Sequence, residues 1–368
     1  MIREYNIIKE QIKLYDLDLT DLTVITECAS GYYAYNTFVP LLAKAKKVVA
    51  VSKTTKYGTF EENKENIYNI AKKLNIDLTN LEIVEKLEDY HLKQADIITN
   101  SGLVRPITRE MIKKLKRTCV IPLMWETWEF RDTDLDLKSC IENDILVLGT
   151  DESHPNLKMY PIGGILGISL LLKLGLEVYK SKVILFGDGI LGNAVAEAFD
   201  KNGVEYIWFV EHKNNENQYL YKDIEKVKKY IPDFDAMIFA EHKYTEEIIS
   251  PKNNITFQEI FELNREIKIG VIAGNINKEE LEKSKLKYYP KEIMPVGYMS
   301  YQPYHLGPRP VIELFSCSMK VAEVMAKCRK NGMSLEETIK YSLENSPAMD
   351  FIGKTYMDRY KEIKSFYK

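Results

Sequence analysis

Short runs of apolar residues alternate with segments of helical periodicity along almost the whole chain. Residues 21–27, DLTVITE, are typical of a buried strand, whereas residues 60–74 have the apolar spacing of a helix that covers one face of a sheet. Buried strands separated by helices predict a parallel sheet with both faces covered. In the first half of the chain the pattern predicts strands over 21–27, 46–52, 81–87, 95–101, 119–125 and 145–149, and helices over 37–46, 60–74, 107–116 and 135–143.

The alternation restarts after a long helix, residues 160–179, whose apolar residues lie on nearly all sides and predict burial. The second half is predicted to contain strands over 181–187, 206–211, 236–241 and 268–274, and helices over 310–330 and 334–345 close the chain. We therefore predict an α/β protein of two domains with parallel sheets. A flavodoxin-like substrate domain comprises residues 1–158, with residues 310–368 packing back on it, and a Rossmann dinucleotide-binding domain comprises residues 159–309.

Composition narrows the class of partner. The 368 residues include 29% charged residues and have a net charge of −3. The chain therefore lacks the excess of basic residues that would indicate nucleic acid as its main partner. The N-terminus alternates charged and apolar residues and lacks the apolar core of a signal peptide, and the apolar run 162–172 is too short to span a bilayer. The five cysteines form no pair or cluster with histidines that is typical of a metal site. We expect a cytoplasmic protein with a small-molecule substrate, no metal and no membrane partner, and a homodimer.

One glycine-rich turn has the context of a dinucleotide site. FGDGILG, residues 186–192, follows an apolar strand and opens a helix. Gly187 permits the tight turn, Gly189 lets the backbone approach a diphosphate, and Gly192 lets the helix pack close to the strand. The helix N-terminus offers free N–H groups to phosphate. Glu211 ends the next strand, where a carboxylate can bind the ribose hydroxyls, so the sequence predicts a dinucleotide cofactor.

The identity of the cofactor follows from charge. Glu211 would repel a 2′-phosphate, which favours NAD, but His212 and Lys213 follow directly and either could pair with a phosphate, so NADP stays open.

A methyltransferase is the other interpretation of the nucleotide-binding half. Residues 27–36, ECASGYYAYN, place an acid and a glycine after a strand, although they lack a GxG loop.

The order of the segments resembles that of a known family. ADIITNSGLVRPITREMIKKL, CVIPLMWETWEFRDTDLDLKSCIENDILVLGT, YPIGGILGISLLLKL and SKVILFGDGILGNAVAEAF follow one another as in the D-2-hydroxyacid dehydrogenases, and S-adenosylhomocysteine hydrolase is similar at a greater distance. The resemblance covers about residues 90–285. It implies that the first and last parts of the chain bind substrate, that the middle part binds NAD, and that hydride passes in the cleft between them. The cofactor residues implied are Gly187, Asp188, Gly189, Ile190, Leu191, Gly192 and Glu211, with Ala240, Glu241, Ala273 and Asn275 at the nicotinamide end.

The chain departs from this family at its catalytic residues. The family's substrate-binding arginine would follow the strand 268–273, where this chain has Gly274 and Asn275. The family's histidine–acid pair is represented only by His305, with no acid at the usual spacing. The hydrolase relative uses a lysine near the interdomain helix, and Lys158 lies near that place.

Other residues are therefore candidates for the chemistry, each with a structural alternative. His305 could take the hydroxyl proton, or it is a surface histidine. Arg309, between two prolines, could clamp a carboxylate, or it merely starts a helix. His154 and Lys158 lie in the segment between the domains, where a desolvated lysine could act as acid or base, or where both are solvated.

The loop MWETWEFR, residues 124–131, follows a strand end, where ligands of open α/β sheets bind. Its tryptophans could form an apolar wall or plug the core, and its charged residues could bind a polar substrate or face water. The next strand end offers a turn and an arginine that could bind a carboxylate or merely cap the loop. The candidates in these two loops are Glu126 as a catalytic residue and Gly102, Arg105, Trp125, Trp128, Glu129 and Arg131 as substrate-binding residues.

These observations predict an NAD(P)-dependent oxidoreductase that acts on a polar hydroxy or keto metabolite in an interdomain cleft. Two alternatives remain. The chain could retain NAD as an internal redox catalyst of a hydrolase or lyase, or it could be a non-catalytic NAD-binding sensor or partner-binding protein that has lost the family's catalytic residues.

Overall fold

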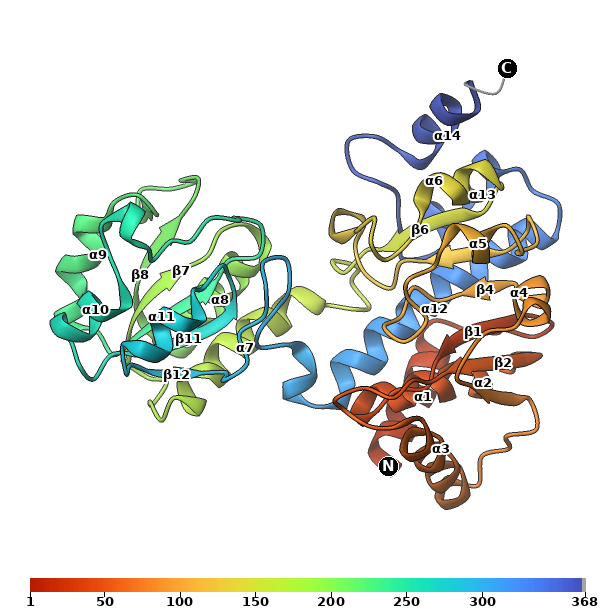
Figure 1. Ribbon diagram of the computed structural model, residues 1–368, viewed down its shortest axis with the longest axis horizontal. Helices are drawn as coiled ribbons and strands as arrows, with labels where there is room; N and C mark the ends of the chain where they lie inside the picture. The colour runs from red at the N-terminus through yellow and green to blue at the C-terminus, as the bar shows by residue number, and fades with distance from the viewer. Residues whose placement is uncertain (366–368) are drawn as a thin grey trace. The chain divides into compact units, whose positions relative to one another are not determined.

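A computed structural model describes residues 1–365 of the chain (Figure 1). The chain divides into two compact units, one formed by residues 1–157 together with the chain from residue 307 onward, the other by residues 158–306. The boundaries predicted from the sequence, at residues 158 and 309, lie beside these. Residues 366–368, the end of the predicted 310–368 segment, lie outside the described part.

The first unit is built on one seven-stranded sheet in the order β13-β6-β5-β4-β1-β2-β3. Six of its strands are parallel: β1 (Thr23–Glu27), β2 (Lys47–Val51), β3 (Leu81–Val84), β4 (Ile97–Ile98), β5 (Val120–Pro122) and β6 (Leu146–Thr150). Every residue of β1, β5 and β6 is buried, as the continuous apolar runs require in a sheet covered on both faces. The predicted flavodoxin-like order is present in β2-β1-β4-β5-β6, and the sheet has two additional edge strands, β3 and the antiparallel β13.

Helices cover both faces of this sheet. They are α1 (Ile2–Leu14), α2 (Phe38–Leu42), α3 (Phe60–Leu74), α4 (Asp89–Gln94), α5 (Arg109–Ile112), α6 (Leu137–Glu142), α12 (Pro308–Lys330), α13 (Leu335–Asn345) and α14 (Tyr356–Ser365), with the 3₁₀ turns η1 (Gly31–Thr37) and η2 (Thr127–Glu129). Helix α12 packs on α1, β5 and β6, and β13 (Ala348–Met349) pairs antiparallel with β6. The last part of the chain therefore belongs to the first unit, and α12 forms part of its core.

Three helices of the first unit, α1, α4 and α14, were not predicted. The N-terminus, interpreted as charged and apolar alternation, forms α1 because Ile7, Ile8 and Gln11 make a narrow buried stripe toward α12. The segment between the predicted strands 81–87 and 95–101, for which no helix was predicted, contains the short helix α4. Within residues 1–365 no helix combines the length and the apolar composition that crossing a bilayer requires.

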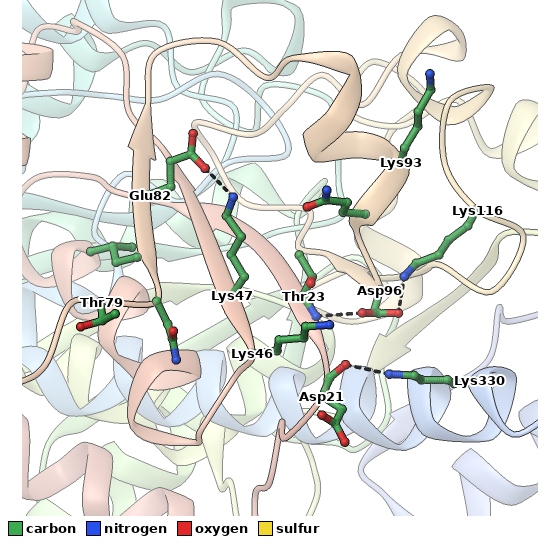
Figure 2. A pocket seen from close by; sticks show the side chains of 13 residues that line it. Asp21, Thr23, Lys46, Lys47, Thr79, Glu82, Lys93, Asp96, Lys116 and Lys330 are labelled. Carbon is green, nitrogen blue, oxygen red and sulfur yellow. Dashed lines mark hydrogen bonds and ion pairs between the residues drawn. The ribbon is translucent and has the colours of Figure 1, made fainter.

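A hollow of about 800 Å³ lies at the amino ends of the first unit's strands (Figure 2). Its lining includes five lysines and three carboxylates: Lys46, Lys47, Lys93, Lys116, Lys330, Asp21, Glu82 and Asp96. Lys47 pairs with Glu82 at 2.6 Å, and Lys116 pairs with Asp96 at 2.6 Å. Ligands of open α/β sheets bind at the opposite, carboxyl edge, so this hollow lies away from the predicted site.

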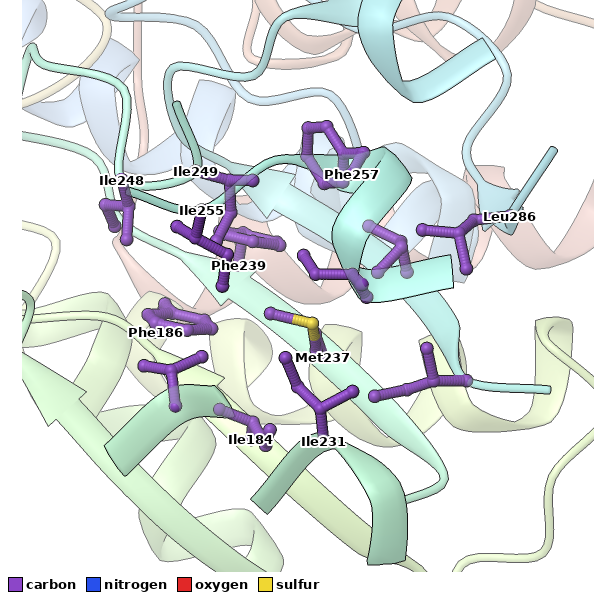
Figure 3. Close-up of a cluster of buried hydrophobic side chains, with 14 of the residues drawn as sticks. Ile184, Phe186, Ile231, Met237, Phe239, Ile248, Ile249, Ile255, Phe257 and Leu286 are labelled. Carbon is purple, nitrogen blue, oxygen red and sulfur yellow. The ribbon is translucent and has the colours of Figure 1, made fainter. Parts of the chain in front are cut away.

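The second unit has a six-stranded sheet in the order β12-β11-β10-β7-β8-β9, all parallel. Its strands are β7 (Lys182–Phe186), β8 (Glu205–Val210), β9 (Gln218–Leu220), β10 (Ala236–Ala240), β11 (Lys268–Ala273) and β12 (Lys287–Tyr289). Its helices are α7 (Met159–Lys173), α8 (Gly189–Asn202), α9 (Ile224–Tyr230), α10 (Phe257–Leu263) and α11 (Lys278–Lys283), and the 3₁₀ turn η5 covers Pro303–Leu306. One core cluster joins the strands to α9 and α10 (Figure 3), and in it Phe186 stacks on Phe209 and Phe239 with ring centroids 5.3 and 4.9 Å apart.

Helices α7 and α8 lie in close contact because glycines face α8. A Cβ atom on Gly164 would lie 2.4 Å from the carbonyl oxygen of Ala194, and one on Gly167 would lie 2.8 Å from Val195. The predicted helix 160–179 ends earlier than expected, since Gly175 adopts a φ of +76° just past α7. Its predicted burial on nearly all sides is also wrong, because Ile165 and Leu172 on the face away from α8 are 52% and 60% exposed.

Candidate functional site

The glycine turn lies at the carboxyl end of β7, beside the carboxyl end of β10. These strands are neighbours in the sheet although their connections run in opposite directions, and such a switch point is where ligands bind in open α/β sheets. A Cβ atom on Gly187 would lie 2.6 Å from the carbonyl oxygen of Ala240, and one on Gly192 would lie 2.4 Å from the backbone of Gly187. Both positions therefore exclude any side chain.

Gly189 is different, because it has a φ of +60° and nothing lies within 4 Å of the place a Cβ would take. It begins α8, whose first N–H groups have no partner within the helix. Asp188 Oδ1 accepts the Gly189 N–H at 2.6 Å, but among the described residues no loop or side chain accepts the N–H groups of Ile190 and Leu191. These two donors and the open face of Gly189 form a cradle for an anion.

A buried acid holds the turn in place. Glu241, 3% exposed, accepts the N–H of Asp188 at 3.1 Å and those of Lys243 and Tyr244 at 2.8 and 3.0 Å, and the Tyr221 hydroxyl also donates to it. Burial and the Glu241 carboxylate raise the pKa of Tyr221. Glu241 was predicted to line the nicotinamide end, but its oxygens are engaged by backbone donors, so it braces the turn instead.

Glu211 lies just past the end of β8 and is 41% exposed. Its neighbour His212 donates its backbone N–H to Asp188 Oδ2 at 2.8 Å, so the turn and the end of β8 are joined. The His212 ring lies 3.6 Å from Glu211 Oε2 and 3.8 Å from Asp188 Oδ2. The surroundings of the predicted ribose site thus hold two carboxylates and one imidazole.

Other predicted cofactor residues lie in the sheet itself. Ala240 and Ala273 are 0% and 1% exposed, because both belong to central strands, and their side chains do not reach an open surface. This corrects the expectation that they line the site. Asn275 is partly exposed, and its side-chain amide donates to the carbonyl oxygen of Thr245 at 2.8 Å, so it holds a neighbouring loop.

In the first unit the predicted substrate residues gather at the carboxyl edge of the sheet. Arg105 Nη1 and Arg131 Nε donate to the same oxygen of Asp134, at 2.7 and 2.8 Å. Both guanidinium groups lie over the Trp125 ring, 4.8 and 5.6 Å from its centroid. The structure therefore brings together Arg105, Trp125 and Arg131, which the sequence placed in two separate loops.

Gly102 adjoins this group. A Cβ atom there would lie 3.4 Å from Glu27 Oε2 and 3.7 Å from Arg105 Nη2. Glu27 is buried at the end of β1 and accepts the N–H of Leu103 at 3.2 Å and the Asn36 side chain at 3.0 Å. Its carboxylate, which the methyltransferase interpretation would use, is therefore engaged internally, and its strand leads into the 3₁₀ turn η1.

The acids of the same edge form a cluster of their own. Glu126, 3% exposed, accepts the Trp128 ring N–H at 2.6 Å and the Glu152 backbone N–H at 3.3 Å. Burial and Glu126 raise the pKa of Glu129 to about 7, and burial together with Glu129 and Glu126 raises the pKa of Glu152. Glu126 therefore works as a hydrogen-bond acceptor inside the first unit, and Trp128 is held to it.

The remaining predicted residues are separate from these groups. Arg309 donates to Glu10 at 3.1 Å and to Glu313 at 2.7 Å, so the expected carboxylate clamp is already occupied. His305 is exposed in η5, its Nδ1 lies 3.0 Å from the backbone of Gln302, and its ring stacks on Tyr304. Lys158 is exposed at the start of α7, and His154 accepts a backbone N–H from Asn156 at 3.3 Å.

Lys53 is a functional candidate that the sequence interpretation missed. It is the first charged residue after β2, and its ammonium donates to the carbonyl oxygen of Arg105 at 3.3 Å. Burial lowers its pKa. Lys53 could have been selected from the sequence, because ligands of open α/β sheets bind just past strand ends. The position of Lys53 after β2 does not by itself show which loop its side chain reaches.

No known protein family's sequence profile matches the chain. No curated protein matches it in sequence. Among solved structures, a dipicolinate synthase subunit from Bacillus halodurans is similar with a TM-score of 0.51 and 12% identity, over 81% of this chain and 96% of that one.

Other structural matches include a 2-hydroxyacid dehydrogenase from Ketogulonicigenium vulgare Y25, with a TM-score of 0.45 and 13% identity over 90% of this chain and 98% of that one. A D-isomer specific 2-hydroxyacid dehydrogenase from Lactobacillus delbrueckii ssp. bulgaricus matches with a TM-score of 0.43 and 12% identity over 84% and 98% of the two chains. Identities this low concern the fold alone. The chain has the α/β fold of the dipicolinate synthase subunit, with two parallel-dominated sheets, and the fold class predicted from the sequence is confirmed.

Proposed function

We propose that the chain is an oxidoreductase that binds NAD at the turn 187–192. The observation that carries this proposal is the cradle at the start of α8, where the N–H groups of Ile190 and Leu191 have no described acceptor and Gly189 has an open face. Such a helix N-terminus binds a diphosphate through backbone hydrogen bonds and its partial positive charge. Bound nicotinamide would supply the hydride chemistry, and the protein would hold and orient it.

Charge at the ribose end supports NAD rather than NADP. A 2′-phosphate beside Glu211 would also meet the carboxylate of Asp188, which is tied to the backbone of His212. The single imidazole of His212 opposes two carboxylates, so a phosphate dianion would be repelled, whereas two ribose hydroxyls could donate to Glu211.

We infer that the substrate is a polar hydroxy or keto compound. The carboxyl edge of the first unit supports this, because Arg105 and Arg131 stack on Trp125 there and supply guanidinium N–H groups. His305 remains the candidate acid or base. Its ring is exposed, its Nδ1 is next to the Gln302 backbone, and its Nε2 has no acceptor or donor among the described residues.

The occupied state of Arg309 favours a second candidate function, an NAD-binding protein without turnover. The arginine that could have replaced the family's substrate-binding arginine is held by Glu10 and Glu313. Turnover of NAD with any hydroxy or keto acid of a broad panel would exclude this alternative.

A matched pair of glycine substitutions tests the cofactor site. Gly189 and Gly31 have φ values of +60° and +61°, and neither has an atom within 4 Å of the place a methyl group would take, so alanine causes similar backbone strain at both. We expect Gly189→Ala to weaken NAD binding at least about tenfold, roughly 1.4 kcal/mol, and Gly31→Ala to leave it unchanged. Isothermal titration calorimetry gives both affinities.

Fluorescence offers an independent measurement, since the Trp208 ring N–H donates to the carbonyl oxygen of Gly187 at 2.8 Å. NAD should alter Trp208 emission in the wild type and in Gly31→Ala at the same concentrations. Equal NAD affinity in the two variants, or no NAD binding by the wild type, would refute the proposal.

A further inference from the structure

The side chain of Lys53 joins the loops that follow β2 and β4. Lys53 follows β2, and its ammonium reaches the carbonyl oxygen of Arg105 in the loop after β4. In the sheet β1 lies between β2 and β4, so this hydrogen bond joins the loops of the two strands that flank β1. This is the switch point of the first unit, where the connections from β1 and β4 leave in opposite directions and a ligand can enter.

The charge of Lys53 has no carboxylate partner in the described part of the chain. Its hydrogen bond goes to a neutral carbonyl group, and the ammonium is partly buried. The nearby acids are engaged elsewhere, because Asp134 accepts from Arg105 and Arg131, and Glu27 accepts from a backbone N–H and a side-chain amide. A partly buried ammonium without a counter-ion is unfavourable in the free protein and attracts an anion.

Arg105 provides a second donor beside Lys53. Its Nη1 is bound to Asp134, whereas its Nη2 has no acceptor among the described residues and lies 3.7 Å from the place of a Cβ on Gly102. The Trp125 ring fixes the guanidinium plane from one side. Gly102 has no side chain, so the approach to Nη2 on that side is bounded by the Glu27 carboxylate, whose Oε2 lies 3.4 Å from the place of the same Cβ.

We propose that Lys53 and Arg105 bind an oxyanion of the substrate, a carboxylate or a phosphate group, at the switch point of the first unit. The ammonium supplies a point charge and the guanidinium supplies directed N–H donors, which is the combination that recognises carboxylates and phosphates. The proposal rests on the proposed function only in assigning the oxyanion to the substrate of the oxidoreductase.

Oxalate and inorganic phosphate serve as probes on the full-length protein. Lysines are converted to ¹³C-dimethyl-lysines, and the Lys53 resonance is assigned as the one that Lys53→Met removes. We expect saturable binding of at least one probe, a raised pKa of Lys53 in its presence, and a loss of affinity of tenfold or more in Lys53→Met. Lys53→Arg should keep part of the affinity, and Lys73→Met, which removes an exposed lysine of α3, should keep all of it.

The free Lys53→Met protein should unfold at the same temperature as the wild type or higher, because a partly buried charge is removed. A weaker oxyanion response with unchanged stability therefore separates binding from folding. Binding of oxalate alone identifies a carboxylate, and binding of phosphate alone identifies a phosphate ester. If neither probe binds, or if Lys53→Met binds as well as the wild type, the inference is overturned. NAD affinity, measured on the same samples, tests the proposed function separately.

Discussion

The two units have the same order of six parallel strands, but they use the switch point differently. In the second unit β7 runs through Gly187 into the long helix α8, and two helix N–H groups remain open. In the first unit β1 runs through Cys28 into the 3₁₀ turn η1, and the loops after β2 and β4 contribute Lys53 and Arg105 instead. One unit thus presents backbone donors, and the other presents charged side chains.

Buried glutamates brace both switch points in opposite directions. Glu241, just past β10, accepts the N–H of Asp188, which lies earlier in the chain in the turn after β7. Glu27 at the end of β1 reaches forward to the N–H of Leu103 in the loop after β4. The comparison teaches that one strand topology can offer either backbone donors or charged side chains at its switch point, depending on the local sequence.

The largest expected effect comes from the glycine that packs α8 against β7. In Gly192→Ala the methyl group would lie 2.4 Å from the Gly187 backbone, which cannot move away as a flexible side chain could. We expect the second unit to lose about 3 kcal/mol of unfolding free energy and NAD binding to disappear. Gly31→Ala, in the first unit, should cost about 1 kcal/mol.

The unfolding free energy of each unit can be measured separately, because Trp125 and Trp128 lie in the first unit and Trp208 lies in the second. Denaturant unfolding followed in the Trp208→Phe background reports the first unit, and in the Trp125→Phe, Trp128→Phe background it reports the second. Equal losses for Gly192→Ala and Gly31→Ala would contradict the comparison.

The second effect concerns the two bracing glutamates. Glu241→Gln replaces an oxygen that accepts the Asp188 N–H by an amide donor, and Glu27→Gln does the same toward Leu103 or Asn36. Each should cost about 2 kcal/mol, the penalty of an unsatisfied buried donor. Only Glu241→Gln should also weaken NAD binding, as calorimetry would show, because only Glu241 holds the turn 187–192 at which NAD is proposed to bind. A similar loss of NAD affinity in Glu27→Gln would remove the distinction.

The third effect tests cofactor choice at Glu211. Glu211→Gln removes one of two carboxylates around the His212 ring. We expect the ratio of NADP to NAD affinity to rise about tenfold, equivalent to about 1.4 kcal/mol. The control Glu216→Gln, an exposed acid of the loop before β9, should leave the ratio unchanged. An unchanged ratio in Glu211→Gln would mean that this carboxylate does not contact the ribose.

The smallest effect is a pH dependence confined to the first unit. Burial and Glu126 raise the folded-state pKa of Glu129 to about 7, above its value of roughly 4.3 in an unfolded chain. The folded protein therefore binds more protons between these values, so stability falls as pH rises from about 4.5 to 7. Glu129→Gln removes this loss and should be more stable than the wild type by about 1 kcal/mol at pH 8, with no advantage at pH 4.5. Thermal unfolding of both proteins, with Glu65→Gln as an exposed control, tests this.

Much of the fold could be predicted from the sequence because its signals are local. The buried strands are continuous apolar runs, and the turn 187–192 lies between one such run and a helix. Errors occurred where the local signal was weak. Helix α1 buries only a narrow stripe, and the additional predicted length of α7 was contradicted by Gly175.

The sequence by itself determined the two alternating halves, the glycine turn and the acid that follows it, because each depends on residues close together in the chain. Only the tertiary structure decided the partners of the charged groups. Arg309 is held by Glu10, 299 positions away, and Lys53 reaches Arg105 across β1. The physical reason is that a charged side chain acts on whatever lies within a few ångströms, and in a parallel sheet those neighbours come from strands that the chain reaches only after long crossovers.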